Sequence, residues 1–332
     1  MTKIIKENQL DEAVKCLANG GTVVFPTETV YGLGGDAFND AAIDKIYKAK
    51  GRPSDNPLIV HISDICDLNR LVEHVSENCR ALADKFWPGP LTMIFPKKDS
   101  VPFRVTGGLN TVAVRFPSNP IAHELIRRSN VLVAAPSANL SGSPSPTICR
   151  HVVNDLNGRV DYIIDGEKCE IGLESTVVDM TGDYPVILRP GAITLEDIQS
   201  VIPEAIFDPH LNEETSRPKC PGMKYKHYAP KAKMEVVIGN KDKVRQYISK
   251  KLESENNVGV MTYKGGDYDR AVCVLPGGEN MREYASRLFY NLRVFDEYGV
   301  SKIYAEFSNE SGIGVAVRNR LYKSAAHNIT EV

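Results

Sequence analysis

Hydrophobic positions recur along the chain with two alternating periods, which predict helices and strands in close succession. Apolar residues at positions 10, 13, 14 and 17 follow the helical spacing, and Gly20 and Gly21 end this pattern. The β-branched run 22–25 then predicts a strand. The same alternation continues to about residue 201, and it predicts a mixed α/β domain.

The elements predicted in this first region are of ordinary length. Helices are expected over 9–19, 40–48, 64–72, 78–86, 121–127 and 147–156, and one more ends near Val201. Strands are expected over 22–25, 58–62, 91–95, 111–116, 131–135, 162–165, 176–180 and 186–189.

The pattern changes after this region. Residues 203–233 are rich in Pro, Lys and other charged residues and show no sustained period, which indicates a linker or a long functional loop. A second unit begins at Met234, and its β-α-β order predicts a small Rossmann-like sheet. Its strands are expected over 234–238, 258–262, 271–275 and 302–307, and its helices over 242–252, 281–295 and 314–323.

Composition adds limits on function and location. The 332 residues carry 40 Lys and Arg against 42 Asp and Glu, so the formal charge of −2 offers no overall attraction to nucleic acid or to an anionic membrane. No apolar stretch approaches the about 20 residues that a membrane helix needs, and the N-terminal residues are charged. The seven cysteines form no C-x-x-C pair. We therefore expect a cytoplasmic protein in a reducing compartment.

The first segment that suggests chemistry is FPTETVYGLG, residues 25–34. Here an apolar strand runs into hydroxyls, a carboxylate and closely spaced glycines, a composition found where strand ends build sites. The segment matches neither of the two common phosphate-binding signatures. An ordinary strand-to-helix turn with capping threonines is the alternative.

A second segment, KAKGRPSDNP, follows the helix expected over 40–48. Lys48, Lys50 and Arg52 place three cationic side chains within five residues. Arg can bind two phosphate oxygens at once and Lys provides a mobile charge, so the loop suits a triphosphate and a departing pyrophosphate. The alternative is favourable positive charge at the C-terminal end of a helix.

A third segment, AAPSANLSGSPS over residues 134–145, follows a buried strand with small polar residues. Small residues permit close approach of a ligand, and Ser and Asn provide donors and acceptors for phosphate and ribose oxygens. Arg115 and Arg189 each follow a predicted strand, where they could bind a carboxylate and a phosphate. Solvated arginines at strand ends are the alternative for both.

Taken together and in order, these motifs resemble the YrdC domain family. The matching segments are PTETVYGLG, KGRPSDNPL, PSANLSG, ESTVVD and LRPG, and PGMKYKHYAP resembles the hinge of the longer, two-domain members. The resemblance implies a YrdC-like twisted mixed sheet with helices over residues 1–205, a linker or lid over 206–233, and a Rossmann-like α/β domain over 234–332.

The resemblance also implies an activity, which is the synthesis of L-threonylcarbamoyl-AMP and pyrophosphate from L-threonine, bicarbonate or CO2, and ATP. This is the first step of a tRNA modification. The implied catalytic residues are Lys50, Arg52, Ser137 and Asn139. The residues implied to bind ATP are Lys50, Ser54, Asn56, Thr111, Asn139, Ser143, Arg189 and Tyr228, and those implied to bind threonine are Thr27, His61, Arg115, Ser137 and Ser175.

The chemistry of this reaction brings two anions together, so it needs cations. We expect Mg²⁺, held by ATP phosphates and water rather than by a protein metal site. A closing linker would protect the labile carbamate from water. We expect the product to pass to the tRNA threonylcarbamoyl transferase machinery.

Two other functions stay open at this point. Lys45, Lys48, Lys50 and Arg52 could form the basic face of an RNA-binding module, although the near-neutral charge opposes it. Transfer of a carbamoyl group, as in the related domains of hydrogenase maturation proteins, is the other alternative. The zinc-finger and acylphosphatase regions expected in those proteins are absent from this sequence, which counts against this alternative.

Overall fold

The computed structural model describes residues 1–211, 228–308 and 311–332, which fall into two compact units. The first unit contains Met1–Ser141, Ser145–Glu170 and the described residues from Glu174 to Leu211. The second contains Gly142–Pro144, Ile171–Leu173 and the described residues from Tyr228 onward. Two short segments of the N-terminal region therefore belong to the second unit. Most of the linker predicted over 206–233 lies outside the described residues.

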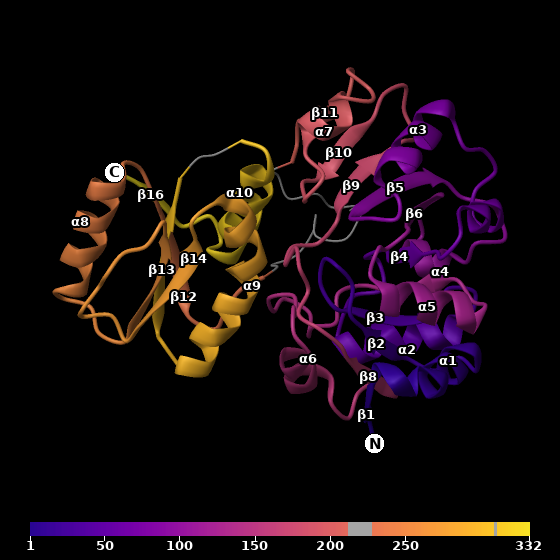
Figure 1. The fold of residues 1–332 in the computed structure, drawn as a ribbon, viewed down its shortest axis with the longest axis horizontal. Helices are drawn as coiled ribbons and strands as arrows, with labels where there is room; N and C mark the ends of the chain where they lie inside the picture. The colour runs from indigo at the N-terminus through magenta and orange to yellow at the C-terminus, as the bar shows by residue number, and fades with distance from the viewer. Residues whose placement is uncertain (212–227, 309–310) are drawn as a thin grey trace. The chain divides into compact units, whose positions relative to one another are not determined.

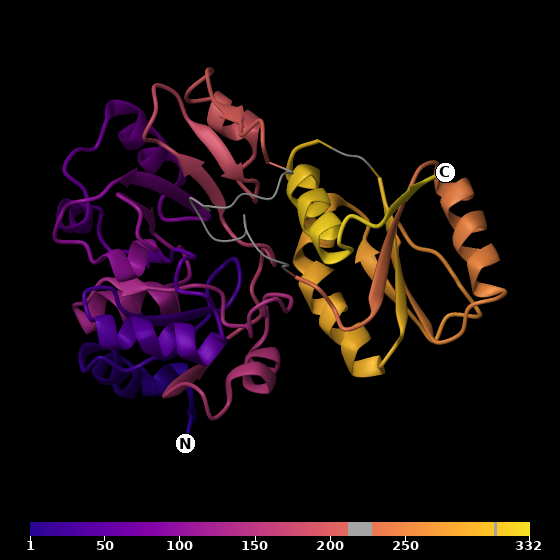
Figure 2. The same ribbon diagram turned by 180° about the vertical axis from the view of Figure 1, so that it is seen from behind.

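The first unit is built on a mixed sheet (Figures 1 and 2) whose strand order is β1-β8-β2-β3-β7-β4-β6-β5-β9-β10-β11. Its strands are β1 (Lys3–Lys6), β2 (Val23–Phe25), β3 (Gly32–Asp36), β4 (Ile59–His61), β5 (Leu91–Pro96), β6 (Thr111–Arg115), β7 (Val133–Ala134), β8 (Tyr162–Asp165), β9 (Thr176–Asp179), β10 (Val186–Arg189) and β11 (Ile206–Phe207). Its α-helices are α1 (Leu10–Ala18), α2 (Asp40–Lys50), α3 (Glu77–Phe86), α4 (Phe103–Thr106), α5 (Pro120–Ser129), α6 (Cys149–Leu156) and α7 (Leu195–Gln199).

One predicted helix of this unit is wrong, and the structure excludes one alternative. The expected helix over 64–72 is a 3-10 helix, η2 (Ile65–Arg70), in which Leu68 is the one buried residue, so no apolar stripe holds a longer α-helix. The alternative of a strand-to-helix turn after residue 25 is excluded, because the chain returns as β3 and pairs antiparallel with β2. The short strand β1 and the 3-10 helix η1 (Glu7–Gln9) were not predicted.

Glycines explain why β3 was missed. A Cβ atom at Gly34 would lie 2.6 Å from Val133 Cγ1 and 2.8 Å from Phe25 Cε1, so only hydrogen fits between these side chains. Strand propensity is low for glycine, and the pattern of apolar side chains is therefore absent from this buried strand. The ring of Phe25 also lies edge-on to the ring of His61, with 6.2 Å between their centroids.

The second unit is a parallel sheet with the strand order β14-β13-β15-β12-β16. Helix α8 covers one face of this sheet, and α9 and α10 cover the other (Figures 1 and 2). The strands are β12 (Lys233–Ile238), β13 (Val258–Tyr263), β14 (Cys273–Gly278), β15 (Lys302–Phe307) and β16 (Ile329–Glu331), and the helices are α8 (Lys241–Leu252), α9 (Met281–Tyr298) and α10 (Ile313–Ser324). β14 begins two residues later than predicted, and β16 was not predicted.

The hydrophobic cores follow the predicted periodicity. Leu10, Ala13 and Leu17 on α1 pack with Leu125 and Ile126 on α5 in one cluster of buried residues. None of the helices in the described residues is both long enough and apolar enough to span a membrane.

Candidate functional site

Lys50 lies at the centre of the predicted catalytic group. Its side chain is 2% exposed, and its Nζ atom donates to the carbonyl oxygen of Ser137, to Asn139 O at 2.8 Å and to Asn139 Oδ1 at 3.3 Å. Ser137 Oγ in turn donates to Asn139 Oδ1 at 2.5 Å. Three of the four predicted catalytic residues therefore form one hydrogen-bonded cluster, although Lys50 and Ser137 are 87 positions apart.

The local structure explains how these residues meet. Gly51 ends α2 in the left-handed conformation, with φ of +62°, and Ser141 N donates to Lys50 O at 2.9 Å. The loop after β7 also lies along β3, because Leu33 N donates to Pro136 O at 2.9 Å and Ala138 N to Tyr31 O at 2.8 Å. Backbone bonds thus fix the Ser137 loop between the end of α2 and the 25–34 segment.

The loop after α2 carries the remaining predicted phosphate contacts. Arg52 Nη2 donates to Pro57 O at 3.1 Å. Asn56 is 1% exposed, and its Oδ1 atom has no hydrogen-bond partner among the described residues, whereas Ser54 is exposed. A buried acceptor without a donor is unfavourable by about 1–3 kcal/mol. Asn56 Oδ1 is therefore a group that a bound ligand or water could satisfy.

Three of the five residues predicted to bind threonine, His61, Arg115 and Ser175, lie together at strand ends. β4 and β6 run parallel with His61 beside Arg115, so the two side chains leave the sheet at the same edge. β5 pairs antiparallel with β6 and places Thr92 beside Arg115. Thr92 Oγ1 and Ser175 Oγ are 2.7 Å apart. His61, Arg115, Thr92 and Ser175 therefore form one row along this edge of the sheet, the Arg115 row.

A buried ion pair joins the 25–34 segment to this row. Arg115 Nη2 lies 2.7 Å from Glu28 Oε1, and the two side chains are 5% and 8% exposed. The two atoms lack hydrogen-bond geometry, and within the described part of the chain neither Glu28 oxygen nor Arg115 Nε or Nη2 has a hydrogen-bond partner. Buried charges normally satisfy all their hydrogen bonds, so this pair has capacity left for a ligand.

Glu28 was not assigned a role from the sequence. The sequence signal was present, because Glu28 is the one charged residue between Gly20 and Gly35. A carboxylate in a run of otherwise buried residues requires a partner, but the pairing with Arg115 depends on the tertiary structure.

Arg189 lies in the same row. Its Nε atom donates to Ser175 O at 3.1 Å and its Nη2 atom to Ser175 Oγ at 3.1 Å, and the residue is 5% exposed. Arg115 and Arg189 thus place two buried guanidinium groups on either side of Thr92 and Ser175. This arrangement suits anionic groups of a ligand.

Thr27 is buried in the loop between β2 and β3. Its Oγ1 donates to Val30 O at 2.6 Å and lies 2.8 Å from Thr29 Oγ1. These bonds fix the loop conformation that presents Glu28.

Three further residues were predicted to contact the nucleotide, namely Thr111, Ser143 and Tyr228. Thr111 is at the amino end of β6, and Arg115 is at the carboxyl end, so the strand separates them by about 13 Å. Ser143 and Tyr228 belong to the second unit, and they are neighbours there because Ala229 N donates to Gly142 O at 3.0 Å. The assignment of all three residues to ATP stays a prediction.

Tyr228 is held firmly within the second unit. It has a φ of +62°, which is rare for a bulky residue. Its ring stacks on Phe289 with 5.0 Å between centroids, and the Arg320 guanidinium lies 5.7 Å from the ring.

His61 is neutral over the physiological pH range. It is 4% exposed, and its Nδ1 lies 3.1 Å from Ile59 O. Burial, and secondly the positive charge of Arg115, lower the pKa of His61 to about 3. A neutral imidazole beside Arg115 does not compete with that residue for an anion.

The lowered pKa of His61 predicts acid sensitivity of the first unit. An unfolded histidine has a pKa of about 6.5, so below this pH the unfolded chain binds a proton that the folded chain excludes down to about pH 3. The free energy of unfolding should therefore decrease as the pH is lowered from about 6.5 to about 3, by up to about 1.4 kcal/mol per pH unit from this group.

Urea unfolding at pH 7 and pH 5 measures this effect through the fluorescence of Trp87, the one tryptophan, which lies in the first unit. His61→Gln should flatten the pH dependence, whereas His74→Gln, at an exposed position, should leave it unchanged. Equal slopes in both variants would show that His61 is not its source.

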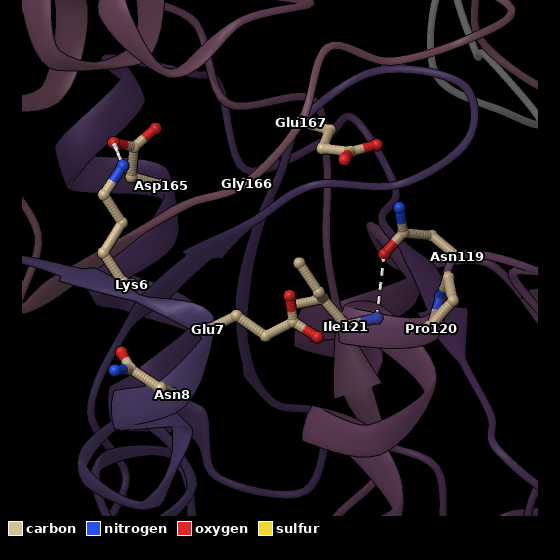
Figure 3. Close-up of a pocket in the computed structure, with 9 residues that line it drawn as sticks. All are labelled: Lys6, Glu7, Asn8, Asn119, Pro120, Ile121, Asp165, Gly166 and Glu167. Atoms are coloured by element: carbon tan, nitrogen blue, oxygen red, sulfur yellow. Dashed lines mark hydrogen bonds and ion pairs between the residues drawn. The ribbon is translucent and has the colours of Figure 1, made fainter.

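A separate cavity of about 1040 Å³ lies in the first unit, and none of the predicted site residues lines it (Figure 3). Lys6 pairs with Asp165 at 2.5 Å and ties β1 to β8, and Asn119 Oδ1 accepts from Ile121 N at the start of α5. These polar groups stabilise the fold, and we assign the cavity no part in the chemistry.

Comparison with known families gives two matches that together span most of the chain. The family described as Telomere recombination, whose label covers Sua5, YciO and YrdC proteins, matches residues 15–191. The family described as Threonylcarbamoyl-AMP synthase, C-terminal domain, matches residues 193–326.

Similar proteins share nearly the full length. The chain is 46% identical over 333 residues to the threonylcarbamoyl-AMP synthase of Pyrococcus abyssi, covering 99% of this chain and 97% of that protein. It is 47% identical over 321 residues to that of Bacillus subtilis, covering 96% and 93%. The crystal structure of P. abyssi Sua5 complexed with L-threonine has a TM-score of 0.96 at 46% identity and covers 100% of both chains. These similarities confirm the predicted fold class.

Proposed function

The chain belongs to the Sua5, YciO and YrdC family described as Telomere recombination, and we propose that it is a nucleotidyltransferase that makes L-threonylcarbamoyl-AMP. The observation that carries this proposal is the similarity to threonylcarbamoyl-AMP synthases over 99% of the chain. The buried cluster of Lys50, Ser137 and Asn139 and the row that contains Arg115 supply the groups that such a reaction needs.

The reaction joins three substrates. The ammonium group of L-threonine first loses a proton. The resulting amine attacks CO2 with release of a second proton, or attacks the carbon of bicarbonate with loss of water, and either route forms a carbamate. A carbamate oxygen then attacks the α-phosphorus of ATP, and the bond to the β-phosphate oxygen breaks, so pyrophosphate leaves. No covalent intermediate with the protein is required.

The Lys50 cluster is proposed to bind the phosphates of ATP. Its ammonium is already oriented by Ser137 and Asn139 oxygens, so it carries a fixed positive charge without further reorganisation. Arg52 lies two residues beyond Lys50 and adds a second cation that can bind two phosphate oxygens. Charge that develops on the leaving pyrophosphate would be stabilised by both.

The Glu28–Arg115 pair is proposed to bind the charged end of threonine. Arg115 would bind the α-carboxylate through the donors that lack a partner, and the Glu28 carboxylate would face the amino group. Because the ammonium group of threonine must lose a proton before the amine can attack CO2, a carboxylate at this position is also suited to accept that proton. His61 and Ser175 lie beside Arg115 and would complete the threonine site.

Mg²⁺ is proposed to enter with ATP. No group of three His, Cys, Asp or Glu side chains in the described part of the chain could hold a metal ion. Mg²⁺ commonly binds through substrate phosphates and water with few protein ligands, so it can act where the protein itself supplies mainly cations and hydroxyls. Bound there, it would neutralise phosphate charge.

The product is proposed to serve tRNA modification. A mixed anhydride of a carbamate and AMP is a reactive acyl donor, so a transferase that acts on a tRNA nucleoside would consume it. The RNA-binding alternative is not supported, because the curated relatives are enzymes and the net charge is −2.

Incubation with ATP, L-threonine and ¹⁴C-bicarbonate tests the proposal. The label should appear in a threonine-containing adenylate, in equal amount to the pyrophosphate released, and omission of threonine should abolish both. A parallel incubation with ¹⁴C-carbamoyl phosphate would contradict the proposal if it gave a labelled carbamoyl product while ¹⁴C-bicarbonate gave no labelled adenylate. Salt-dependent RNA binding without any labelled adenylate would also contradict it.

A further inference from the structure

The second unit contains a cavity of about 310 Å³ that neither the family motifs nor the proposed reaction uses. It lies at one edge of the parallel sheet, where β12, β13 and β15 end. Gly239 follows β12, Tyr263 ends β13, and Glu306 and Phe307 end β15. The cavity shares no residue with the predicted ATP and threonine sites.

The topology of the sheet makes this edge a natural ligand site. After β13 the chain forms β14, which is the next strand on one side. After β15 it forms α10 and then β16, which lies on the other side, beyond β12. The neighbouring strands β13 and β15 thus send their connections in opposite directions. In open parallel sheets, ligands bind at the carboxyl ends of strands at such a point.

One wall of the cavity carries a buried carboxylate. Glu306 is 4% exposed, and it accepts hydrogen bonds from Tyr263 N at 2.7 Å and from the Tyr268 hydroxyl. A carboxylate has about four acceptor positions, so these two bonds leave capacity for further donors. Vicinal hydroxyls of a sugar are donors of this kind.

Two lysines stand at the cavity. Lys241 Nζ donates to Lys264 O at 2.9 Å, and Arg245 Nη2 donates to Gly265 O at 2.5 Å, so cations of α8 hold the loop that follows β13. Both Lys241 and Lys264 line the cavity, and they give it the positive charge that a phosphate requires.

The backbone beside the cavity is strained at Lys264, and glycines take up positive φ at two neighbouring positions. Lys264 has φ of +58°, although it is not glycine, and Gly265 follows with φ of +73°. Gly239 has φ of +149°, and a Cβ atom there would lie 2.2 Å from Val332 O. Such conformations cost about 1–3 kcal/mol for residues with a side chain and gather at ligand sites.

Val244, Tyr263 and Phe307 form the apolar part of the lining and offer a surface for a flat ring, and Ser308 adds a hydroxyl. We propose that this cavity binds a mononucleotide, with its base against these side chains, its ribose hydroxyls on Glu306 and its phosphate on Lys241 and Lys264. A volume near 300 Å³ is at the small end of ligand pockets and suits a ligand of this size. This proposal does not depend on the proposed function.

Equilibrium dialysis of the full chain with radiolabelled AMP and GMP tests the site. Lys241→Glu combined with Lys264→Glu should remove one equivalent of bound nucleotide or weaken its Kd at least about ten-fold. Threonylcarbamoyl-AMP synthesis should be unchanged. Lys243→Glu with Lys250→Glu makes the same charge change at exposed positions of α8 and should leave binding intact.

Glu306→Gln provides a second test, which concerns recognition of the ribose hydroxyls. The unchanged chain should bind AMP more tightly than 2′,3′-dideoxy-AMP at this site, and the variant should lose that preference. Nucleotide binding that is equal in the Lys241/Lys264 variant and the unchanged chain would overturn the proposal. An equal loss in the Lys243/Lys250 control would also overturn it, because it would show a general effect of charge.

Discussion

Replacing Lys50 by alanine is expected to reduce kcat for threonylcarbamoyl-AMP synthesis by at least about 100-fold. The substitution removes a buried positive charge and leaves the oxygens of Ser137 and Asn139 without their shared donor. Both effects act where the phosphates of ATP are proposed to lie. The rate of pyrophosphate release at saturating ATP and threonine measures the loss.

Lys48→Ala is the matched control for this variant. Lys48 lies two residues earlier on the same helix, but it is exposed and should be replaceable with little change in rate. Calorimetry of L-threonine binding separates catalysis from folding, because the Lys50 variant should still bind threonine at the Arg115 row. A kcat close to that of the unchanged protein would contradict the role of Lys50.

Replacing Glu28 by glutamine is expected to lower kcat/KM for threonine by about 100-fold, or about 2.7 kcal/mol. The side chain keeps its shape, so the change removes only the negative charge beside Arg115. A neutral amide neither attracts an ammonium group nor accepts its proton. It also leaves the Arg115 guanidinium buried without a counter-charge, which should lower stability. Initial rates at varied threonine and saturating ATP measure the effect.

The control for Glu28 is Asp179→Asn. Asp179 is also a buried carboxylate, but it lies at the far end of β9 from Ser175 and accepts from Thr181 N at 3.0 Å. It should change stability without changing the KM for threonine. Trp87 fluorescence measures the stability of both variants. If Glu28→Gln lowers the stability but not kcat/KM for threonine, the role of Glu28 is structural only.

Periodicity predicted most of the fold because burial imposes it locally. Helices such as α1 and α5 each have an apolar stripe, and strands such as β2 and β13 are buried along their whole length. The exceptions have physical reasons. β3 is a strand of small residues that is defined by the side chains packed over it, and η2 is too weakly buried to form a full α-helix.

The candidate site was predicted in part. Lys50, Ser137 and Asn139 meet as the motifs suggested, and Arg115, His61 and Ser175 share one edge of the sheet. Neither fact follows from spacing along the chain. The sequence alone allowed helix-end charge and turn formation as alternative explanations for each residue, and the motifs acting together favoured a site.

By itself the sequence determined the two α/β units, the family and the residue types available for chemistry, because these depend on local patterns and on matching segments. Only the tertiary structure decided that Glu28 faces Arg115 and that Lys50 is buried against the loop after β7. Strand register and backbone bonds between distant segments set those contacts. The function of a buried charge such as Glu28 or Lys50 depends on the groups that contact it, and the tertiary structure sets those contacts.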